Sequence, residues 1–485
     1  MKKKTDESQF ANRYNKAVNI SSYIYIGLPV LIFMIGWVRW IVSVPAALII
    51  VYSFYTASKK DNPHYICPRR NSRTTLIVVF AVICGWVFLS GIGGFVYQNG
   101  DHKCRNEIFR ILVEYEWPVQ KDVMVGNQQQ TRMLSYYMGF WLPSAIVGKV
   151  FGLSAGFAFQ AVWAVWGICL IYLKISARFG RYGIIPLLIF VFFSGLDILG
   201  YPLLGKEDFI IGSNQHIEFW GGFQFSSHTT QLFWVFNQAI YGWILTLMLL
   251  EQEDNRHSVL IWSCGLLECT FPFVGMLPFL CYKVFRNFRK RVANDSARKA
   301  CKELFSVENV IGGGLIGIIS FLYLLNNGSA GNGGSGIPIT LRSIGRYLVF
   351  MSLEAFVYYI TIYKFQKKNP LFYISLLTLM VCPLIRVGSS IDFCMRVSIP
   401  SILVLCLLVS ETLFETWKTH KRHFAVLLVI SLLGCITPVH EICRTIENTT
   451  CIDNNIHYTS EKDIFTGRNF SSNTADSLFY RYLSR

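Results

Sequence analysis

Long runs of apolar residues, separated by short polar loops, dominate this chain from about residue 22 onward. Many of these runs approach the roughly 20 residues that an α-helix needs to cross a bilayer. The runs are continuous rather than alternating in polarity, so they predict membrane-spanning helices and not membrane β-strands. We therefore expect an all-α polytopic membrane protein, built as a bundle of about 11 to 13 transmembrane helices.

The composition agrees with this prediction. Hydrophobic residues make up 53% of the 485 positions and charged residues only 15%, whereas a soluble domain carries about 25% charged residues. The regular alternation of apolar runs and loops indicates one membrane domain rather than several soluble ones. The sequence has no internal repeat, which argues against a transporter assembled from two inverted halves.

The basic residues indicate how the chain is oriented. The formal net charge is +16, and lysines and arginines gather in short loops between the apolar runs, as cytoplasmic loops do under the positive-inside rule. This placement accounts for the charge without a nucleic-acid partner. No secretory cleavage site follows the MKKK start, so we expect a bacterial inner (plasma) membrane protein with a cytoplasmic N-terminus and an extracytoplasmic C-terminus. The basic clusters are Lys59, Lys60, Arg69, Arg70 and Arg73; Lys174, Arg178 and Arg181; Arg286, Arg289, Lys290 and Arg291; Lys364, Lys367 and Lys368; and Lys418, Lys421 and Arg422.

The alternation divides the chain into four segments. Residues 1–21 form the cytoplasmic N-terminus, and residues 22–57 form an additional transmembrane hairpin. Residues 74–440 form the transmembrane core, and residues 441–485 form a polar external tail. The tail holds Cys443 and Cys451, two of the 14 cysteines of the chain. A disulfide between them would suit an extracytoplasmic tail, and the sequence leaves the pairing open.

Two stretches do not fit simple spans. Residues 134–152 are apolar enough to insert, but they contain Lys149, and if they spanned, the next basic cluster would fall on the wrong side. We therefore expect them to lie along the interface, as an interfacial helix of the first external loop. Val259–Val284 contains Pro272 and Pro278, and we expect it to break there into two short helices that enter and leave from the cytoplasm.

Polar residues gather in three loops that this topology places on the extracytoplasmic face. The loops are residues 95–135, 195–230 and 384–400. The first loop has Ile108 and Leu112 at helical spacing, which predicts an amphipathic helix along the interface. Because the three loops share one face, we expect their side chains to converge on one site. The ionisable residues of the chain would then cluster at that interface and not at mid-membrane.

Two carboxylates follow apolar runs directly. Asp101 comes just after a predicted span and is followed by His102 and Arg105. It can be a general base, or a carboxylate that orients a nucleophile, and the alternative is an ordinary solvated side chain. Asp197 lies at the edge of the hydrocarbon, where an ionisable residue is a functional candidate. Its alternative is a helix-end carboxylate that faces headgroup water.

The third loop contributes the best cluster of cations. Arg386 and Arg396 flank Asp392, and arginines at a membrane surface can hold a phosphate through bidentate, charge-assisted hydrogen bonds. Contact with lipid headgroups, or a structural ion pair, is the alternative. Lys149 presents a similar choice between a snorkelling lysine and a point charge on the phosphate of a lipid carrier.

The second loop offers a weaker metal candidate. His216 and Glu218 could ligate a divalent cation together with Asp101 or Asp197, because an i, i+2 pair fits an extended loop. No third ligand is fixed by the sequence, so we favour ordinary polar loop residues. Trp220 could stack on a sugar ring or serve as an interfacial aromatic.

The layout of these residues resembles the GT-C superfamily of integral-membrane glycosyltransferases that use polyprenyl-phosphate sugars. The resemblance covers roughly residues 74–440 and is greatest to bacterial proteins related to protein mannosyltransferases and to lipid A aminoarabinose transferases. The pattern has an acidic residue in the first external loop and an interfacial helix with aromatics and proline. After these come a span that ends in a basic-Phe-Gly turn, a second acidic residue, and arginines late in the chain. The corresponding residues are Asp101; Tyr136, Tyr137, Trp141 and Pro143; Arg178, Phe179 and Gly180; Asp197; and Arg386 and Arg396.

This resemblance implies inverting transfer of a sugar from a polyprenyl-phosphate-linked donor to a glycan, lipid or protein acceptor of the cell envelope. Asp101 and Asp197 would be the catalytic carboxylates, and Arg386, Arg396 and Lys149 would stabilise the departing phosphate. The chain departs from the family by its additional hairpin and by a single acid where many relatives have two adjacent ones, which leaves metal dependence open. The residues expected to contact sugar or acceptor are His102, Arg105, Tyr137, Trp141, His216, Glu218, Trp220 and Asp392.

Three other functions remain open from the sequence. A lipid-linked glycan polymerase or ligase would also have a large external loop with arginines, and it would use a lipid-diphosphate donor. A transporter or flippase of envelope precursors would place charges at mid-membrane and show repeated broken helices. A non-catalytic membrane scaffold would tolerate the loss of Asp101.

Overall fold

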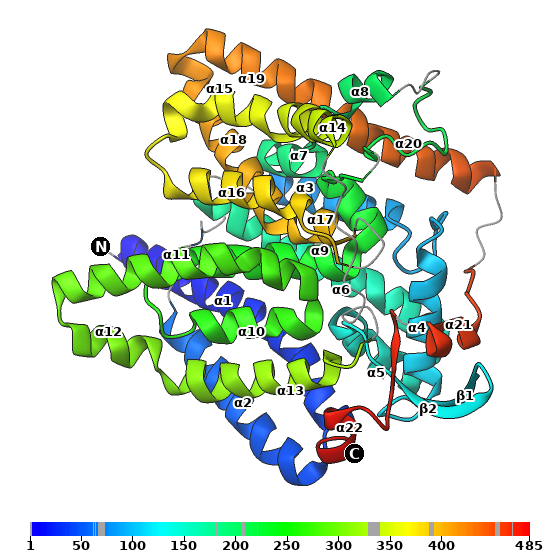
Figure 1. Ribbon diagram of the computed structural model, residues 1–485. Coiled ribbons are helices and arrows are strands. Elements are labelled where there is room, and N and C mark those ends of the chain that lie inside the picture. The colour runs from blue at the N-terminus through cyan, green and yellow to red at the C-terminus, as the bar shows by residue number, and fades with distance from the viewer. Residues whose placement is uncertain are drawn as a thin grey trace.

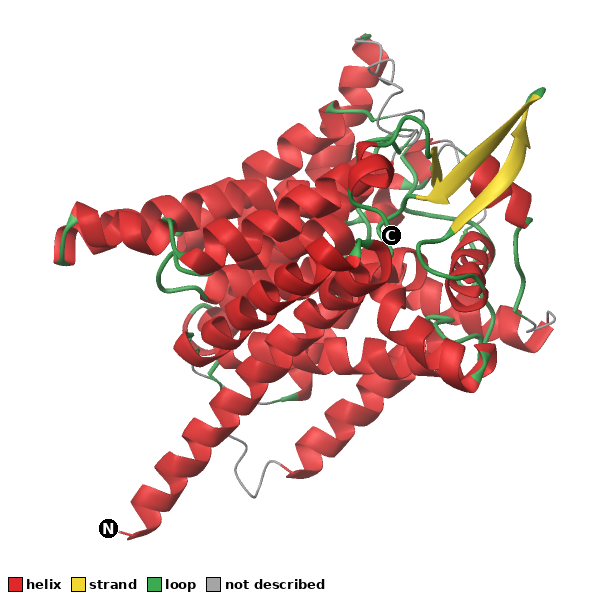
Figure 2. Cartoon of the chain, turned by 90° about the horizontal axis from the view of Figure 1, so that it is seen from below, coloured by secondary structure: helices red, strands yellow, loops and turns green. Residues whose placement is uncertain are grey.

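A computed structural model shows a bundle of helices with a small β-sheet at one end (Figures 1 and 2). Among the residues that the structure describes, eight helices have the length and apolarity to cross a membrane, and five shorter apolar helices of 10–17 residues accompany them. The prediction of an all-α polytopic membrane protein is therefore confirmed. The structure describes residues 2–61, 63, 65, 73–180, 183–204, 209–220, 222–327, 340–387, 392–451, 456–467 and 469–485, and only the backbone of residues 2–9.

The helices follow one another with short connections. The first half of the chain contains α1 (Lys2–Trp37), α2 (Trp40–Lys60), α3 (Arg73–Leu89), α4 (His102–Glu114), α5 (Leu142–Phe151), α6 (Leu153–Arg178), α7 (Ile184–Phe192), α8 (Asp197–Gly200) and α9 (His228–Glu251). The second half contains α10 (Ser258–Glu268), α11 (Thr270–Asn294), α12 (Ala297–Leu304), α13 (Gly314–Leu324), α14 (Leu341–Met351), α15 (Val357–Gln366), α16 (Pro370–Val381), α17 (Asp392–Val397), α18 (Ile399–Thr419), α19 (Lys421–Gly434), α20 (Ile436–Cys451), α21 (Glu461–Thr466) and α22 (Leu478–Tyr482).

Short 3-10 and π turns join or extend these helices. The 3-10 turns are η2 (Gly139–Trp141), η3 (Pro202–Leu204) and η6 (Cys382–Leu384). The π turns are η4 (Glu308–Gly313), which leads into α13, and η5 (Ser352–Phe356), which lies between α14 and α15. Single π turns inside helices are frequent at functional sites, because they turn a side chain out of the regular helical register.

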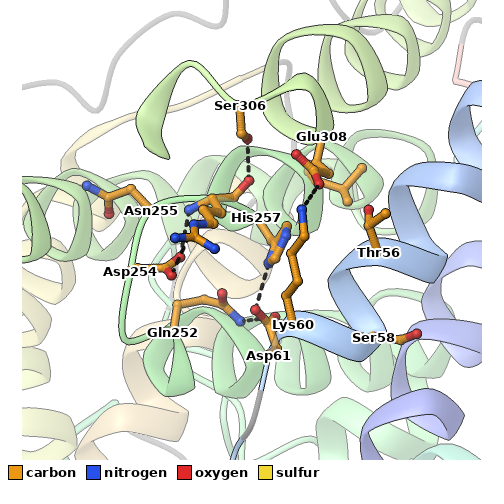
Figure 3. A network of polar contacts seen from close by, with 12 residues as sticks. Thr56, Ser58, Lys60, Asp61, Gln252, Asp254, Asn255, His257, Ser306 and Glu308 are labelled. Carbon is orange, nitrogen blue, oxygen red and sulfur yellow. Dashed lines mark hydrogen bonds and ion pairs between the residues drawn. The ribbon is translucent and has the colours of Figure 1, made fainter. Parts of the chain in front are cut away.

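Polar contacts hold the basic-loop end of the bundle together (Figure 3). Lys60 at the end of α2 pairs with Glu308 at 2.8 Å. Asp61 pairs with His257 at 2.6 Å and accepts a hydrogen bond from Gln252 at 2.9 Å. These contacts join the first hairpin to the turn between α9 and α10 and to the start of α13, so the additional hairpin packs as part of the bundle.

The other end of the bundle carries the sheet. Strands β1 (Gln120–Val125) and β2 (Gln128–Leu134) form an antiparallel hairpin, and β3 (Ser471–Asn473) adds to β2, in the order β1-β2-β3. Gly126 in the hairpin turn has a φ of 62°, a conformation that glycine adopts without strain. The tail therefore contributes a strand to a sheet that the first external loop begins, instead of forming a separate segment.

The end of the tail is attached to the first hairpin. Arg39, between α1 and α2, donates from Nε to the Ser484 carbonyl at 2.6 Å. The Arg485 N–H donates to the Trp37 carbonyl at 3.0 Å. The α1–α2 turn, the sheet and the tail thus share one end of the molecule, which we call the sheet end.

Helix α9 folds back on itself near its start. Val235 has non-helical angles of φ −138° and ψ 35°. The rings of His228 and Trp243 lie 5.4 Å apart, although 15 residues of straight helix would separate them by about 22 Å. Residues 228–234 therefore run back beside the rest of α9, and residues 222–227 before them are all buried.

The stretch Val259–Val284 forms the two helices that we expected, α10 and α11, but the break is at Cys269 rather than at the prolines. Cys269 has φ −151° and ψ 67°. Pro272 lies in the first turn of α11, where a missing N–H costs nothing because the first turn has no intrahelical acceptors for its donors. Pro278 is accommodated inside the helix.

Two further expectations can be compared with the structure. Residues 134–152 do not form a spanning helix: β2 ends at Leu134, and only the ten residues of α5 are α-helical. Cys443 and Cys451 are both free and lie eight residues apart on α20. Eight residues of helix separate two Cα atoms by about 12 Å, whereas a disulfide needs less than about 7 Å.

We predict that the two ends of the bundle face opposite sides of the membrane. In a background without native cysteines, the variants Asn127→Cys, Asp101→Cys and Asp392→Cys should react with an impermeant maleimide in intact cells. Ser296→Cys, between α11 and α12, should react only after permeabilisation, because the basic loops lie at that end. Labelling of positions 101 and 392 from opposite sides would exclude a common site.

Candidate functional site

The break in α9 fixes the position of α4. A helix that bends sharply leaves backbone carbonyls without their intrahelical donors. The Phe233 carbonyl accepts hydrogen bonds from His102 Nε2 at 3.0 Å and from Asn99 Nδ2 at 2.8 Å. Burial lowers the pKa of His102 to about 3, and the Arg105 charge also lowers it. His102 is therefore a neutral donor that holds α4 against α9.

This contact also positions Arg105, one turn further along α4. Arg105 lies next to Phe236, just after the bend in α9. Its guanidinium carbon lies 5.6 Å from the centre of the Phe236 ring. Nη2 pairs with Asp101 at 3.1 Å. Within the described part of the chain, Nε and Nη1 have no hydrogen-bond partner, although Arg105 is only 5% exposed.

Arg396 on α17 has a closely similar environment. Its guanidinium lies 5.7 Å from the centre of the Phe271 ring and pairs through Nη2 with Asp392 at 3.2 Å. Nη1 donates to the Tyr137 hydroxyl at 2.7 Å. Its Nε is buried and has no partner among the residues that the structure describes.

Two tyrosines lie between the arginines. The Tyr136 hydroxyl donates to the Tyr137 hydroxyl at 2.8 Å, and the charges of both Arg105 and Arg396 act on both hydroxyls. Burial raises the pKa of Tyr137, which the Arg396 charge opposes in part, so the phenol stays protonated. Because the Tyr137 oxygen accepts from Arg396 and Tyr136, its own hydrogen remains to donate to a ligand.

These four residues and their two carboxylates form what we call the arginine site. Buried N–H and O–H groups without acceptors cost free energy, so the site is built for a ligand that brings acceptor oxygens. An anion such as a phosphate fits this donor set. The side chains of Asp101 and Asp392 are 50% and 42% exposed, and each lies beside a buried cation, where a carboxylate can receive a proton from a nucleophile. The site consists of Asp101, Arg105, Tyr136, Tyr137, Asp392 and Arg396.

The two other predicted phosphate ligands have contacts of their own. Arg386 packs against Gly222, where an added Cβ would come within 2.6 Å of Arg386 Nη2. Lys149 donates to the carbonyls of Val113 and Tyr115, at 3.1 and 2.5 Å. Val113 is eight residues beyond Arg105 on α4, or about 12 Å along the helix. The structure therefore does not bring Lys149 to the paired arginines.

A second polar cluster lies inside the bundle. The Asp197 side chain accepts hydrogen bonds from Ser194 at 3.1 Å and Thr437 at 2.9 Å, and it faces the carboxyl group of Glu354. Both acids are buried. Neither side-chain oxygen of Glu354 has a hydrogen-bond partner among the described residues. Glu354 lies in the π turn η5, twelve residues before the end of α15, which is about 18 Å of helix.

The expectation that ionisable residues cluster at one interface is therefore wrong. Glu354 lies near the middle of the helical run Leu341–Gln366. Asp197 lies beside it because α7 ends at Phe192, and Phe193, Ser194 and Leu196 continue the chain as buried, non-helical residues. The sequence contains a signal for Glu354, a single carboxylate within an apolar helical run, which is a functional candidate by default. Glu268, at the break before α11, is a second fully buried acid of this kind.

Glu218 and His216 lie in the described stretch 209–220 that precedes α9. Glu218 accepts hydrogen bonds from the Ser227 N–H at 2.9 Å and from Thr230 at 2.6 Å. Burial and the neighbouring Asp197 charge raise its pKa to about 7. His216 lies 3.8 Å from Glu441. Burial alone would lower the pKa of His216, but the Glu441 and Glu218 carboxylates outweigh it and raise the pKa.

Some of the residues that were predicted to bind sugar or metal lie in the arginine site, and the others do not. Arg105, Tyr137 and Asp392 belong to the arginine site. Trp141 and Trp220 are only 1% and 2% exposed, and Trp220 donates to Asp197 at 3.4 Å, so their rings are packing surfaces. Within the described residues, no group of three or more His, Cys, Asp or Glu side chains could hold a metal ion.

Protonation of Glu218 should stabilise the fold in acid. Its pKa is about 7 in the folded protein and about 4.3 in an unfolded chain. This contribution to the free energy of unfolding is complete when the pH is below the pKa of the unfolded chain. It is lost at about 1.4 kcal/mol per pH unit as the pH rises to 7. The melting temperature in detergent should fall between pH 5 and 7. Glu218→Gln, which mimics the protonated acid, should reduce that fall, and an unchanged slope would refute the assignment.

Comparison of the chain with protein-family models, with curated proteins and with solved structures returns no match. The geometry of the arginine site and of the buried acids, together with the layout of the sequence, therefore indicates the function.

Proposed function

We propose that this protein is a membrane glycosyltransferase that moves a sugar from a polyprenyl-phosphate-linked donor to a cell-envelope acceptor. The observation that carries the proposal is the arginine site. Three segments far apart in the sequence contribute to it, and its two buried guanidiniums retain N–H groups without partners in the described structure. The phosphate of the donor would accept those hydrogen bonds, while the lipid tail remains in the bilayer.

The transfer needs few groups beyond these. The acceptor hydroxyl attacks the anomeric carbon and its proton passes to Asp101. The bond between that carbon and the phosphate oxygen breaks, and its electron pair leaves with the phosphate. Arg105, Arg396 and the Tyr137 hydroxyl stabilise the charge that develops there. Attack from the side opposite the leaving phosphate inverts the anomeric carbon.

Asp101 is the better base of the two half-exposed carboxylates. It immediately precedes α4 and is half exposed, and Arg105 contacts it in a charge-assisted pair at 3.1 Å. Asp392 pairs with Arg396 one turn away on α17, so it positions the phosphate-binding guanidinium. This assignment replaces the sequence-based role of Asp392 in sugar binding with a positioning role. It also leaves Asp197, inside the bundle, outside the chemical step.

A second candidate function is proton-coupled transport of an envelope precursor. Two observations favour it: the carboxyl pair Asp197 and Glu354 inside the bundle, and the breaks at Val235 and Cys269. Transporters use broken helices and mid-membrane charges in this way. We place it second because the arginine site lies at the end of the bundle and has its own base.

Asp101→Asn and Arg396→Ala should abolish the glycan product. Loss of a general base costs about 10² to 10⁴ in rate, and loss of a charge-stabilising donor about 10² to 10³. In a deletion strain complemented with each variant, surface glycans measured by mass spectrometry should lack the sugar. Asp122→Asn and Arg342→Ala change exposed residues of the same kinds and should restore it. Full rescue by both site variants, at equal protein abundance, would exclude this catalytic site.

Glu354→Gln separates the two candidate functions. A glycosyltransferase should keep its product, because Glu354 does not touch the arginine site, while its melting temperature shifts. A proton-coupled transporter should lose all export, and the complete precursor should accumulate inside the cell. Mass spectrometry of the intracellular precursor pool distinguishes these results. Accumulation of complete precursor in the Glu354→Gln strain, with none in the Asp101→Asn strain, would favour transport.

A further inference from the structure

A hollow on the outside of the bundle lies between α1 and α5, near the sheet end. Its volume is about 580 Å³, and its walls include Ile32, Ile35 and Ile146. Trp117 closes one side, since an added Cβ on Gly36 would come within 2.6 Å of the Trp117 ring. We call this hollow the α1–α5 groove. It is apolar along its walls and is not part of the arginine site.

Charged residues line the same groove. Lys149, Arg485 and Glu116 all contribute to it. The Lys149 ammonium is held by the carbonyls of Val113 and Tyr115 and lies 5.1 Å from the Trp117 ring centre. An ammonium has three donors, so one N–H remains after those two hydrogen bonds. The groove therefore has a fixed point charge, a second cation at its rim and one side-chain carboxylate, and these three side chains sum to +1.

The apolar wall continues down α1. Ile24 and Ile35 are 47% and 60% exposed, and eleven residues of helix bring them to nearly the same face. The eleven residues span about 16 Å, whereas one leaflet of the hydrocarbon core is about 15 Å thick. An acyl chain that runs along this wall would thus extend through one leaflet, with its headgroup at the cations.

We propose that the α1–α5 groove binds an anionic glycerophospholipid, with its phosphodiester on Lys149 and Arg485 and an acyl chain along Ile32 and Ile35. The charge complementarity and the length of the wall select this occupant: a free phosphate would not use the wall, and a soluble partner would not reach it. The inference does not rest on the proposed glycosyl transfer. It assigns Lys149 to a bound membrane lipid and not to the donor phosphate.

The test is a titration of full-length protein in mild detergent with phosphatidylglycerol, followed by native mass spectrometry. Removal of each cation should weaken binding of the first lipid about five-fold, so Lys149→Ala/Arg485→Ala should weaken it about 25-fold. The matched control Lys103→Ala/Lys462→Ala removes two exposed lysines at the same end of the bundle and should bind as the wild type does. Glu116→Gln should bind more tightly, because it removes a repulsive charge.

Three other results would contradict lipid binding in the α1–α5 groove. Equal weakening in the control pair would show attraction by general surface charge only. Competition by millimolar inorganic phosphate at the same affinity would show a phosphate site without a lipid. Lys149 also bonds the end of α4, so Lys149→Ala can destabilise the fold. Arg485→Ala and Glu116→Gln leave that contact in place, and wild-type affinity in both would overturn the proposal.

Discussion

The rest of the structure depends on the requirement that backbone carbonyls inside a membrane protein find donors. Water is absent from the hydrocarbon region, so every break in a spanning helix must be compensated by another part of the chain. At the bend of α9, His102 and Asn99 supply the donors to Phe233. This one compensation fixes α4 against α9, and it places Arg105 near the pair of tyrosines that Arg396 contacts from α17.

The buried cations and the buried acids differ in the groups that surround them. Each arginine of the site lies beside an aromatic ring and a half-exposed carboxylate. Burial of its positive charge therefore costs only a moderate amount of free energy. Asp197 and Glu354 have no buried cation beside them in the described structure. Two buried carboxyl groups side by side repel each other unless one of them is protonated. One fold therefore keeps a charged site at its end and a buried carboxyl pair inside.

The membrane class, the first hairpin and the convergence of Asp101 with Arg396 could be predicted from hydrophobic runs and from charge asymmetry, because these depend on local composition. The β-hairpin at residues 120–134 was missed, although the Gly126-Asn127 pair between strand-like runs is a turn signal. The depth of Asp197 could not be predicted. It depends on where α7 stops and on the return of residues 228–234, which are tertiary features that apolar runs do not encode. The separation of Lys149 from the arginines also depends on the length of α4 and not on the order of the loops.

The β-sheet has a consequence for the order in which the molecule is completed. Its first strand begins at residue 120, but the strand that closes it begins at residue 471. At about 5 to 20 residues per second, the 351 residues between them take roughly 20 to 70 s to synthesise. During that time β2 has an unpaired edge, a template for unwanted strand pairing. The sheet end is thus the last part of the fold to form, and a chain that stops early would insert most of its helices yet keep this edge exposed.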